Sequence, residues 1–148
     1  MIQSLSQVII HIIFSTKNRQ KFLSKEIQKE VHAYLATIIR NMGAEAFRVG
    51  GTADHIHITC SLPRTISQSD FLKKIKHDSS HWLKTDKLKD FSWQRGYGVF
   101  SVSKSQLENL LSYIDNQEKH HEKVSFKEEL IMFLQKYNIA YDESYLWE

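Results

Sequence analysis

The stretch from Gln7 to Ser15 constrains the fold of this chain strongly, because it is almost entirely apolar and rich in β-branched residues. Its sequence is Gln-Val-Ile-Ile-His-Ile-Ile-Phe-Ser. A short, nearly continuous apolar run of this kind is typical of a strand in the interior of a sheet. We therefore predict a buried central strand near the start of the chain.

The rest of the chain alternates between strand-like and helix-like segments. Strand-like composition occurs at 7–15, 44–49, 55–62 and 96–103, with a turn at Gly50-Gly51. Apolar residues at helical spacing after capping serines predict helices at about 24–40, 67–83, 106–122 and 125–136. This order predicts an α+β, ferredoxin-like (split βαβ) fold. Two crossover helices would cover one face of an antiparallel sheet, and a tyrosine-bearing helix and a final helix would follow.

Composition is that of an ordinary globular protein, with 148 residues that are 41% hydrophobic and 25% charged. We predict one domain spanning residues 1–148, since no repeat or linker interrupts the pattern. The single cysteine, Cys60, excludes an internal disulfide, and the N-terminus lacks the features of a signal peptide. No apolar run reaches the roughly 20 residues of a membrane span. These features predict a cytoplasmic protein, and the net charge of +3 permits a nucleic-acid partner.

Two histidines, His55 and His57, flank one isoleucine within the third strand-like segment. Side chains alternate between the faces of a strand, so both histidines point to one face and Ile56 to the other. Two imidazoles in this arrangement are able to bind a single metal ion. The pattern alone is weak evidence, and it needs a third ligand and a reactive group elsewhere.

The segment around Tyr113 supplies both groups. Tyr113 and Gln117 are four residues apart, so on the expected helix they share a face one turn apart. An amide oxygen is able to ligate a metal, and a phenol is able to act as a nucleophile. His120 and His121 follow near the same face.

Together these residues predict a metal-assisted attack on a phosphodiester. A metal held by His55, His57 and Gln117 would keep open positions for a phosphate oxygen. Attack by Tyr113 would then form a phosphotyrosine, which stores the energy of the broken bond. Such a site would break and rejoin DNA strands, because a free 3′-hydroxyl is able to reverse the linkage without ATP.

Five blocks in order along nearly the whole chain resemble the HUH single-tyrosine transposases, including REP-associated members. These are small enzymes of insertion sequences that move as single-stranded DNA. The matching blocks are His11–Arg19, Gly50–His57, Ile75–Trp82, Phe91–Ser103 and Tyr113–Gln117 with His120-His121.

The resemblance implies that His55 and His57 bind the metal, that Tyr113 is the nucleophile and that Gln117 is the third ligand. It implies Mg²⁺ or Mn²⁺, whereas the ligand types alone also allow Zn²⁺. It further implies single-stranded DNA with hairpins as the substrate, and a homodimer. In such a dimer the tyrosine helix of one subunit is able to complete the metal site of the other, and the sequence leaves open which subunit supplies it.

Several residues have two interpretations that the sequence leaves open. Asp54 either fixes the tautomer of a ligand histidine or shapes the turn before the strand. His11 either faces the site or is a structural histidine, and His120 and His121 either support the site or are exposed polar residues. Candidate contacts with DNA are Lys17, Arg19, Lys73, Lys76, Trp93 and Arg95.

Two other classes of protein are alternatives. A non-catalytic ferredoxin-like module would bind single-stranded nucleic acid by stacking and charge, without metal. Its expected aromatic residues are not evident here, because the central strands hold isoleucine and histidine. A metallo-phosphodiesterase would use activated water and would not depend on Tyr113.

Overall fold

A four-stranded antiparallel sheet forms the centre of the structure, a computed structural model that describes residues 2–148. The strands lie in the order β2-β3-β1-β4. Their bounds are β1 Ile9–Ser15, β2 Ala46–Gly51, β3 His55–Ser61 and β4 Gly98–Ser101. Helices connect β1 to β2 and β3 to β4, so the predicted α+β, ferredoxin-like fold is confirmed. The predicted central strand lies in the interior of the sheet, between β3 and β4.

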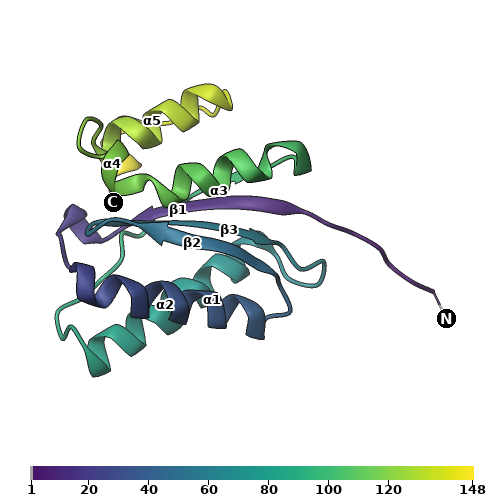
Figure 1. Cartoon of the computed structure of the whole chain (residues 1–148), viewed down its shortest axis with the longest axis horizontal. Coiled ribbons are helices and arrows are strands. Elements are labelled where there is room, and N and C mark those ends of the chain that lie inside the picture. The colour runs from purple at the N-terminus through teal and green to yellow at the C-terminus, as the bar shows by residue number, and fades with distance from the viewer. Residues whose placement is uncertain (1) are drawn as a thin grey trace.

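Helices cover both faces of the sheet, so the molecule has three layers (Figure 1). On one face lie the two crossover helices, α1 Lys25–Asn41 and α2 Gln68–Asp86. On the other lie α3 Leu107–Asp115, α4 Gln117–His120 and α5 Phe126–Lys136. The short elements are η1 Lys17–Arg19, η2 Lys104–Gln106 and α6 Glu143–Leu146. The sheet face opposite the crossover helices is therefore covered by a layer formed by α3, α4 and α5.

Residues of β1 and β3 alternate between two apolar cores. Ile12 and Ile58 belong to the larger core, which lies against α1 and α2. Ile13 belongs to a smaller core on the opposite face, together with Leu130 of α5. Ile13 pairs with His57 in the sheet register. The histidines of β1 and β3 therefore face the layer formed by α3, α4 and α5.

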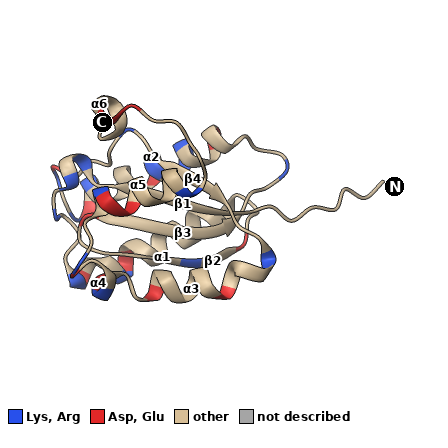
Figure 2. Cartoon of the chain, turned by 90° about the horizontal axis from the view of Figure 1, so that it is seen from above, with Lys and Arg blue, Asp and Glu red and all other residues tan. Residues whose placement is uncertain are grey.

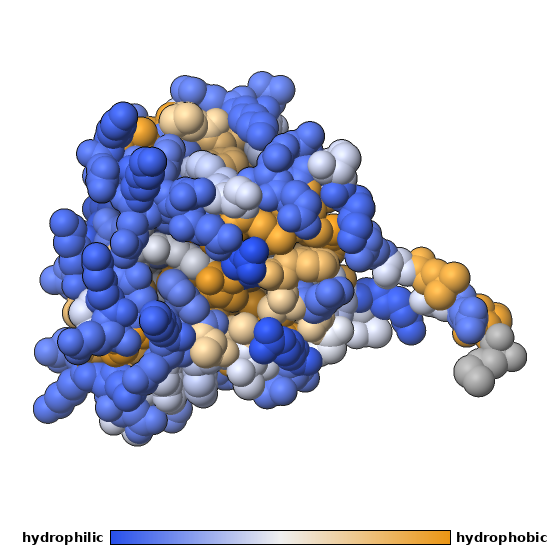
Figure 3. Space-filling view, in the orientation of Figure 1, coloured by the Kyte–Doolittle hydropathy of each residue, from blue (hydrophilic) through white to orange (hydrophobic). Residues whose placement is uncertain are grey.

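Charged residues lie around the sheet rather than in its centre. β1, β3 and β4 contain no Lys, Arg, Asp or Glu, and Figure 2 shows the charges on the surrounding helices and loops. Figure 3 shows apolar residues at the level of the sheet, between the hydrophilic outer surfaces of the helical layers. Among residues 2–148, every helix is too short or too polar to cross a membrane.

The helix expected at 106–122 is interrupted at Asn116, which separates α3 from α4. Asn116 has φ −102° and ψ 20°, outside the helical region. Its side-chain amide donates to the carbonyl of Ser112 at 2.8 Å. An asparagine that bonds to nearby backbone competes with helix continuation, which explains the break. Tyr113 therefore lies near the end of α3, and Gln117 begins α4.

The Gly50-Gly51 pair ends β2 instead of forming the expected turn, which lies at residues 52–54. Gly51 has φ +146°, a conformation that residues with a side chain rarely adopt. A Cβ atom on Gly50 would lie 2.6 Å from Ile114 Cγ2 of α3. The missing side chain thus allows the tyrosine-bearing helix to pack closely on the sheet.

Candidate metal and tyrosine site

His55 and His57 lie on one face of β3, as their spacing predicted. Their rings lie between the sheet and the layer formed by α3, α4 and α5. Both side chains are fully buried, while Ile56 lies in the opposite core. Their Nε2 atoms converge on one carboxylate oxygen, Glu129 Oε1, at 3.5 Å from His55 and 2.9 Å from His57. The two imidazoles therefore face a common point.

Asp54 contacts His55 on the side of the ring that faces away from the cluster. The Nδ1 atom of His55 lies 2.7 Å from Asp54 Oδ1 and 3.0 Å from Thr52 Oγ1. Burial alone would raise the pKa of Asp54, but its hydrogen bond with His55 outweighs burial and lowers the pKa. An ionised Asp54 accepts a hydrogen bond from the Nδ1–H group of His55, which leaves the Nε2 lone pair of His55 directed into the site.

His11 of β1 contacts His57 in a similar way. Its Nε2 atom lies 2.8 Å from His57 Nδ1, and the two rings are stacked. Burial lowers the pKa of His57 to about 4, although a hydrogen bond to Glu129 opposes the shift. Burial and the nearby His57 also hold the pKa of His11 well below its ordinary value. His57 is therefore neutral at pH 7, as a metal-binding imidazole must be.

Gln117 brings an amide oxygen to the histidine pair, as the sequence predicted. Its Oε1 atom lies 2.9 Å from the Nε2 atoms of both His55 and His121. Its Nε2 group donates to Glu129 Oε2 at 3.1 Å, which turns the oxygen toward the imidazoles. The side chain is buried, so the break at Asn116 leaves Gln117 in contact with the site.

Glu129 of α5 is the site residue that the sequence interpretation missed. It is 1% exposed, and its Oε1 atom lies 3.2 Å from His121 Nε2. Burial alone would raise its pKa, but hydrogen bonds from His121 and His57 hold that pKa well below its ordinary value. A sequence signal existed, because Glu129 shares the buried face of α5 with Phe126 and Leu130. A carboxylate within an apolar stripe is unusual and requires a partner.

The geometry of these groups fits a divalent metal ion. Ligand atoms of His55, His57, His121 and Glu129 all lie within 4.8 Å of one another. Ligands about 2.1 Å from a six-coordinate ion are about 3.0 Å apart when adjacent and about 4.2 Å apart when opposite. Imidazole nitrogens combined with amide and carboxylate oxygens suit Mn²⁺ and Zn²⁺, and the oxygens also suit Mg²⁺.

Tyr113 lies at the edge of the same cluster. Its hydroxyl donates to Glu129 Oε2 and lies 3.3 Å from His120 Nε2. Burial and the negative charge of Glu129 raise the pKa of Tyr113. The phenol therefore stays protonated at neutral pH and would need an acceptor for its proton in order to react. His120 and His121 are both partly buried, and both contact Glu129.

A cavity of about 810 Å³ reaches Tyr113 and Glu129. Its walls come from η2, α3 and α5, and it also borders His11 and His120. Phe133 and Tyr137 contribute aromatic surface to the same cavity. The phenol is therefore accessible from outside, although the histidine pair behind it is fully buried.

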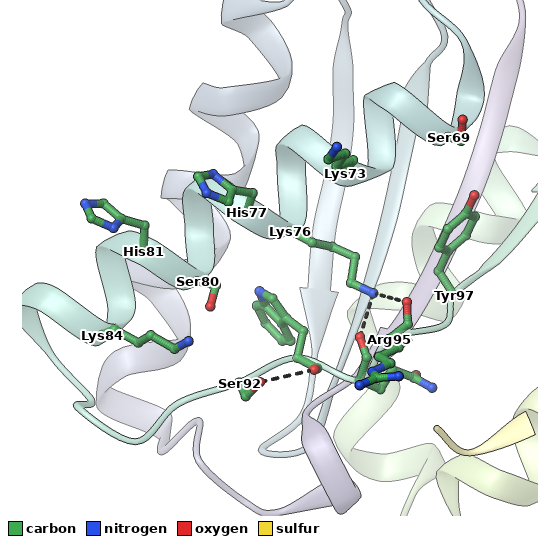
Figure 4. Close-up of a pocket in the computed structure, with 12 residues that line it drawn as sticks. Ser69, Lys73, Lys76, His77, Ser80, His81, Lys84, Ser92, Arg95 and Tyr97 are labelled. Carbon is green, nitrogen blue, oxygen red and sulfur yellow. Dashed lines mark hydrogen bonds between the residues drawn. The ribbon is translucent and has the colours of Figure 1, made fainter.

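A second cavity, of about 500 Å³, lies between α2 and the loop before β4 (Figure 4). Its lining includes the cations Lys73, Lys84 and Arg95 together with several histidine and serine side chains. The backbone nitrogen of Lys17 donates to the carbonyl of Ser92 in this lining, so the basic loop after β1 lies beside the cavity. Several of the candidate DNA contacts thus gather at one place on the surface.

Two of those candidates have structural partners inside the protein. Lys76 Nζ donates to the carbonyls of Gln94, Arg95 and Gly96 at 2.6–3.0 Å. Trp93 is 6% exposed and packs edge-on against Phe14, and its indole nitrogen donates to Ser79. We expected Trp93 to stack on DNA bases; that expectation is corrected, because its ring is held in the core.

Arg19 of η1 is not among the residues that line the cavity beside α2. Its guanidinium is 5.7 Å from the ring centroid of Trp147, near the C-terminal end of the described residues. Arg19 and Asn18 both have φ 54°, so the loop after β1 is tightly turned. Arg19 therefore packs against the C-terminal segment.

The protein is thus of the α+β class, with a ferredoxin-like sheet that carries paired histidines and with helices that bring an amide oxygen and a tyrosine to them in a candidate metal-dependent site. Residues 4–117 match the model of the family described as "Transposase IS200 like". The chain belongs to this transposase family, which confirms the resemblance carried by the five sequence blocks. The match ends at Gln117, so His121 and Glu129 lie beyond it.

Solved structures share the fold. A Deinococcus radiodurans R1 protein assigned as a transposase is 24% identical, with a TM-score of 0.64 over 79% of this chain and 98% of that one. A REP-associated tyrosine transposase bound to a REP hairpin is 16% identical, with a TM-score of 0.62 over 84% of this chain and 74% of that one. No curated protein is similar enough to be matched.

Proposed function

We propose that this transposase cleaves and rejoins single-stranded DNA through a covalent bond between Tyr113 and a 5′-phosphate. One observation supports the proposal most directly. The carboxylate of Glu129 accepts a hydrogen bond from the Tyr113 phenol and also contacts His57. The nucleophile would therefore stand at the edge of the metal-binding cluster, where one phosphate is able to meet both.

His55, His57 and Gln117 would hold Mg²⁺ or Mn²⁺, which when bound would polarise a phosphate oxygen. Tyr113 would attack the phosphorus in line with the departing 3′-oxygen. The bond from the phenolic oxygen to phosphorus forms, and the bond from phosphorus to the 3′-oxygen breaks. The phenolic proton passes to a neighbouring acceptor, and the 3′-oxygen takes up a proton to become a free hydroxyl.

The phosphotyrosine keeps a phosphoester in place of the one that was broken. A 3′-hydroxyl from another DNA end is therefore able to attack it, which releases Tyr113 and joins the two strands. No nucleotide cofactor is needed, because each step exchanges one phosphoester for another. This exchange distinguishes strand transfer from hydrolysis by a metallo-phosphodiesterase.

The DNA would contact the basic cavity between α2 and the loop before β4. Lys73, Lys84 and Arg95 line that cavity and offer charge to phosphates of the backbone. The structural similarity to a transposase bound to a DNA hairpin supports the same class of substrate here. We therefore propose single-stranded DNA that forms hairpins near the ends of the mobile element.

The candidate site uses residues of one chain, since Tyr113 and Gln117 contact a cluster that contains His55 and His57 of the same subunit. This arrangement supports a site completed within each subunit. A homodimer would still provide the second Tyr113 that a second cleavage and the exchange of ends require.

The proposal is tested by incubating the protein with labelled single-stranded DNA from both flanks of its gene and with Mn²⁺. We expect a protein–DNA adduct that resists denaturation, and its loss in Tyr113→Phe. Tyr145→Phe is the matched control, because Tyr145 is 68% exposed and is expected to leave the adduct unchanged. An adduct that persists in Tyr113→Phe would show that the nucleophile is another residue. Free cleaved products without an adduct would instead indicate hydrolysis.

A further inference from the structure

We infer that Glu129 is a direct ligand of the divalent metal, so that α5 completes a site begun by β3 and α4. The inference rests on the proposed function, because it concerns the metal that the histidine pair would hold. Glu129 lies beyond residues 4–117, the part of the chain that matches the transposase family.

The packing of α5 directs Glu129 toward the sheet. The helix begins with a capping box, in which Ser125 Oγ accepts from the Glu128 backbone and the Glu128 side chain accepts from the Ser125 backbone. Phe126 and Leu130 flank Glu129 on the buried face and pack in the core between α5 and the sheet. These contacts hold the carboxylate in place.

The two oxygens of Glu129 have different surroundings. Oε2 is held by hydrogen bonds from Tyr113 and from Gln117, whose amide nitrogen is 3.1 Å away. Oε1 points to the place where three imidazoles converge. It lies 2.9, 3.2 and 3.5 Å from the Nε2 atoms of His57, His121 and His55. These separations are those of adjacent ligands around one ion, which are about 3.0 Å apart.

Charge gives a second reason. A carboxylate that is 1% exposed has lost its hydration and requires nearby positive charge. A divalent cation at the point of convergence supplies it. A carboxylate oxygen also favours hard ions such as Mg²⁺ and Mn²⁺ over softer ones.

The test measures Mn²⁺ binding to the full chain without DNA, by electron paramagnetic resonance of the free ion and by calorimetry. Loss of residues that only support a ligand typically weakens metal binding by about 10–100-fold. We therefore expect Glu129→Gln, which keeps the shape of the side chain, to raise the Kd by at least about tenfold. Glu128→Gln is the matched control, since it is the neighbouring exposed glutamate and glutamine preserves a capping box. Its Kd should equal that of the wild type.

A Kd for folded Glu129→Gln within about twofold of the wild type would overturn the inference. The wild-type protein with ¹³C-labelled glutamate distinguishes a direct ligand from a residue that only supports one, and it also provides the test if the variant does not fold by circular dichroism. One equivalent of Mn²⁺ should then shift the infrared stretch of a single glutamate carboxylate. An unshifted spectrum would also overturn the inference.

The result is independent of strand cleavage. If Tyr113→Phe still forms the DNA adduct, the proposed nucleophile fails while the Mn²⁺ titration remains valid. If Glu129→Gln binds Mn²⁺ normally but His55→Ala does not, only the role of Glu129 fails. If His55→Ala also binds Mn²⁺ normally, the proposed metal site itself fails.

Discussion

His55 and His57 are each oriented by a polar residue that contacts the Nδ1 atom of the ring. Asp54 contacts Nδ1 of His55, and His11 contacts Nδ1 of His57, so both Nε2 atoms face the same point. Such contacts fix the tautomer and the ring direction before a metal arrives. The burial that excludes water from the histidine pair also keeps His57 neutral, which suits it for metal binding but makes the fold sensitive to acid.

We expect the metal-free protein to lose thermal stability as the pH falls from about 6.5 to about 4. Burial lowers the pKa of His57 from 6.5 to about 4, so within this window the unfolded chain binds a proton that the folded chain does not. His121 acts in the opposite sense: its hydrogen bond with Glu129 outweighs burial and raises its pKa. The stability it adds is therefore lost as the pH rises, not as it falls.

Melting temperatures measured from pH 7 to pH 4 check this expectation. His57→Gln removes the titrating group and should give a shallower decline than the wild type. Identical slopes for the two proteins would mean that His57 does not remain neutral in the folded state.

Sequence patterns predicted the residues whose positions depend on local structure. The alternation in β3 placed His55 and His57 on one face, and the spacing of Tyr113 and Gln117 placed those two residues on one face of a helix. The resemblance to the transposases then implied that this face meets the histidine pair, which agrees with the contacts in the structure. Glu129 was not predicted, because its role depends on how α5 folds back over the sheet. That packing is a long-range contact, and the order of elements in the chain does not determine it.

At the scale of elements, close packing and helix interruption set the position of the tyrosine. Gly50 allows α3 to approach β2, and the break at Asn116 separates the helix of Tyr113 from that of Gln117. The helix expected at 106–122 did not include this break. Its apolar periodicity stops at Ile114, and the polar residues that follow are compatible with a continuing helix as well as with an interruption. The turn expected at Gly50-Gly51 was wrong for a related reason: glycine marks close approach as well as turns.

The helix α2 presents two kinds of lysine, and they should respond differently to substitution. Lys73→Met should weaken binding of single-stranded DNA and reduce the slope of log affinity against log salt by about 1, with no change in stability. Lys76→Met should leave the carbonyls of Gln94, Arg95 and Gly96 without their donor and destabilise the fold by about 1–3 kcal/mol. Salt-dependent DNA binding and denaturant unfolding separate the two effects. A Lys73→Met protein with an unchanged salt slope would exclude this lysine from the DNA surface.

At the scale of the whole molecule, the three-layer arrangement encloses the cluster within a single subunit. The sheet supplies the histidine pair, and the layer formed by α3, α4 and α5 supplies Tyr113, Gln117 and Glu129. The ferredoxin-like order was predictable from sequence because strands and helices alternate clearly. The sequence could not decide which subunit supplies the tyrosine, since both arrangements use the same residues.

Mixing two inactive variants distinguishes a site within one subunit from a shared one. Tyr113→Phe retains the metal-binding residues, whereas His57→Ala retains the nucleophile. We expect the mixture to form no DNA adduct, because neither subunit has a complete site of its own. Adduct formation by the mixture, above that of each variant alone, would show that subunits exchange their tyrosine helices.

The central claim is that Tyr113 itself becomes joined to DNA. Mass spectrometry of the protein–DNA adduct, after digestion with nuclease and protease, tests it directly. We expect a nucleotide attached through its 5′-phosphate to the peptide that contains Tyr113, and only when Mg²⁺ or Mn²⁺ was present. A nucleotide on any other residue, or an adduct formed equally well in the presence of a chelator, would contradict the account.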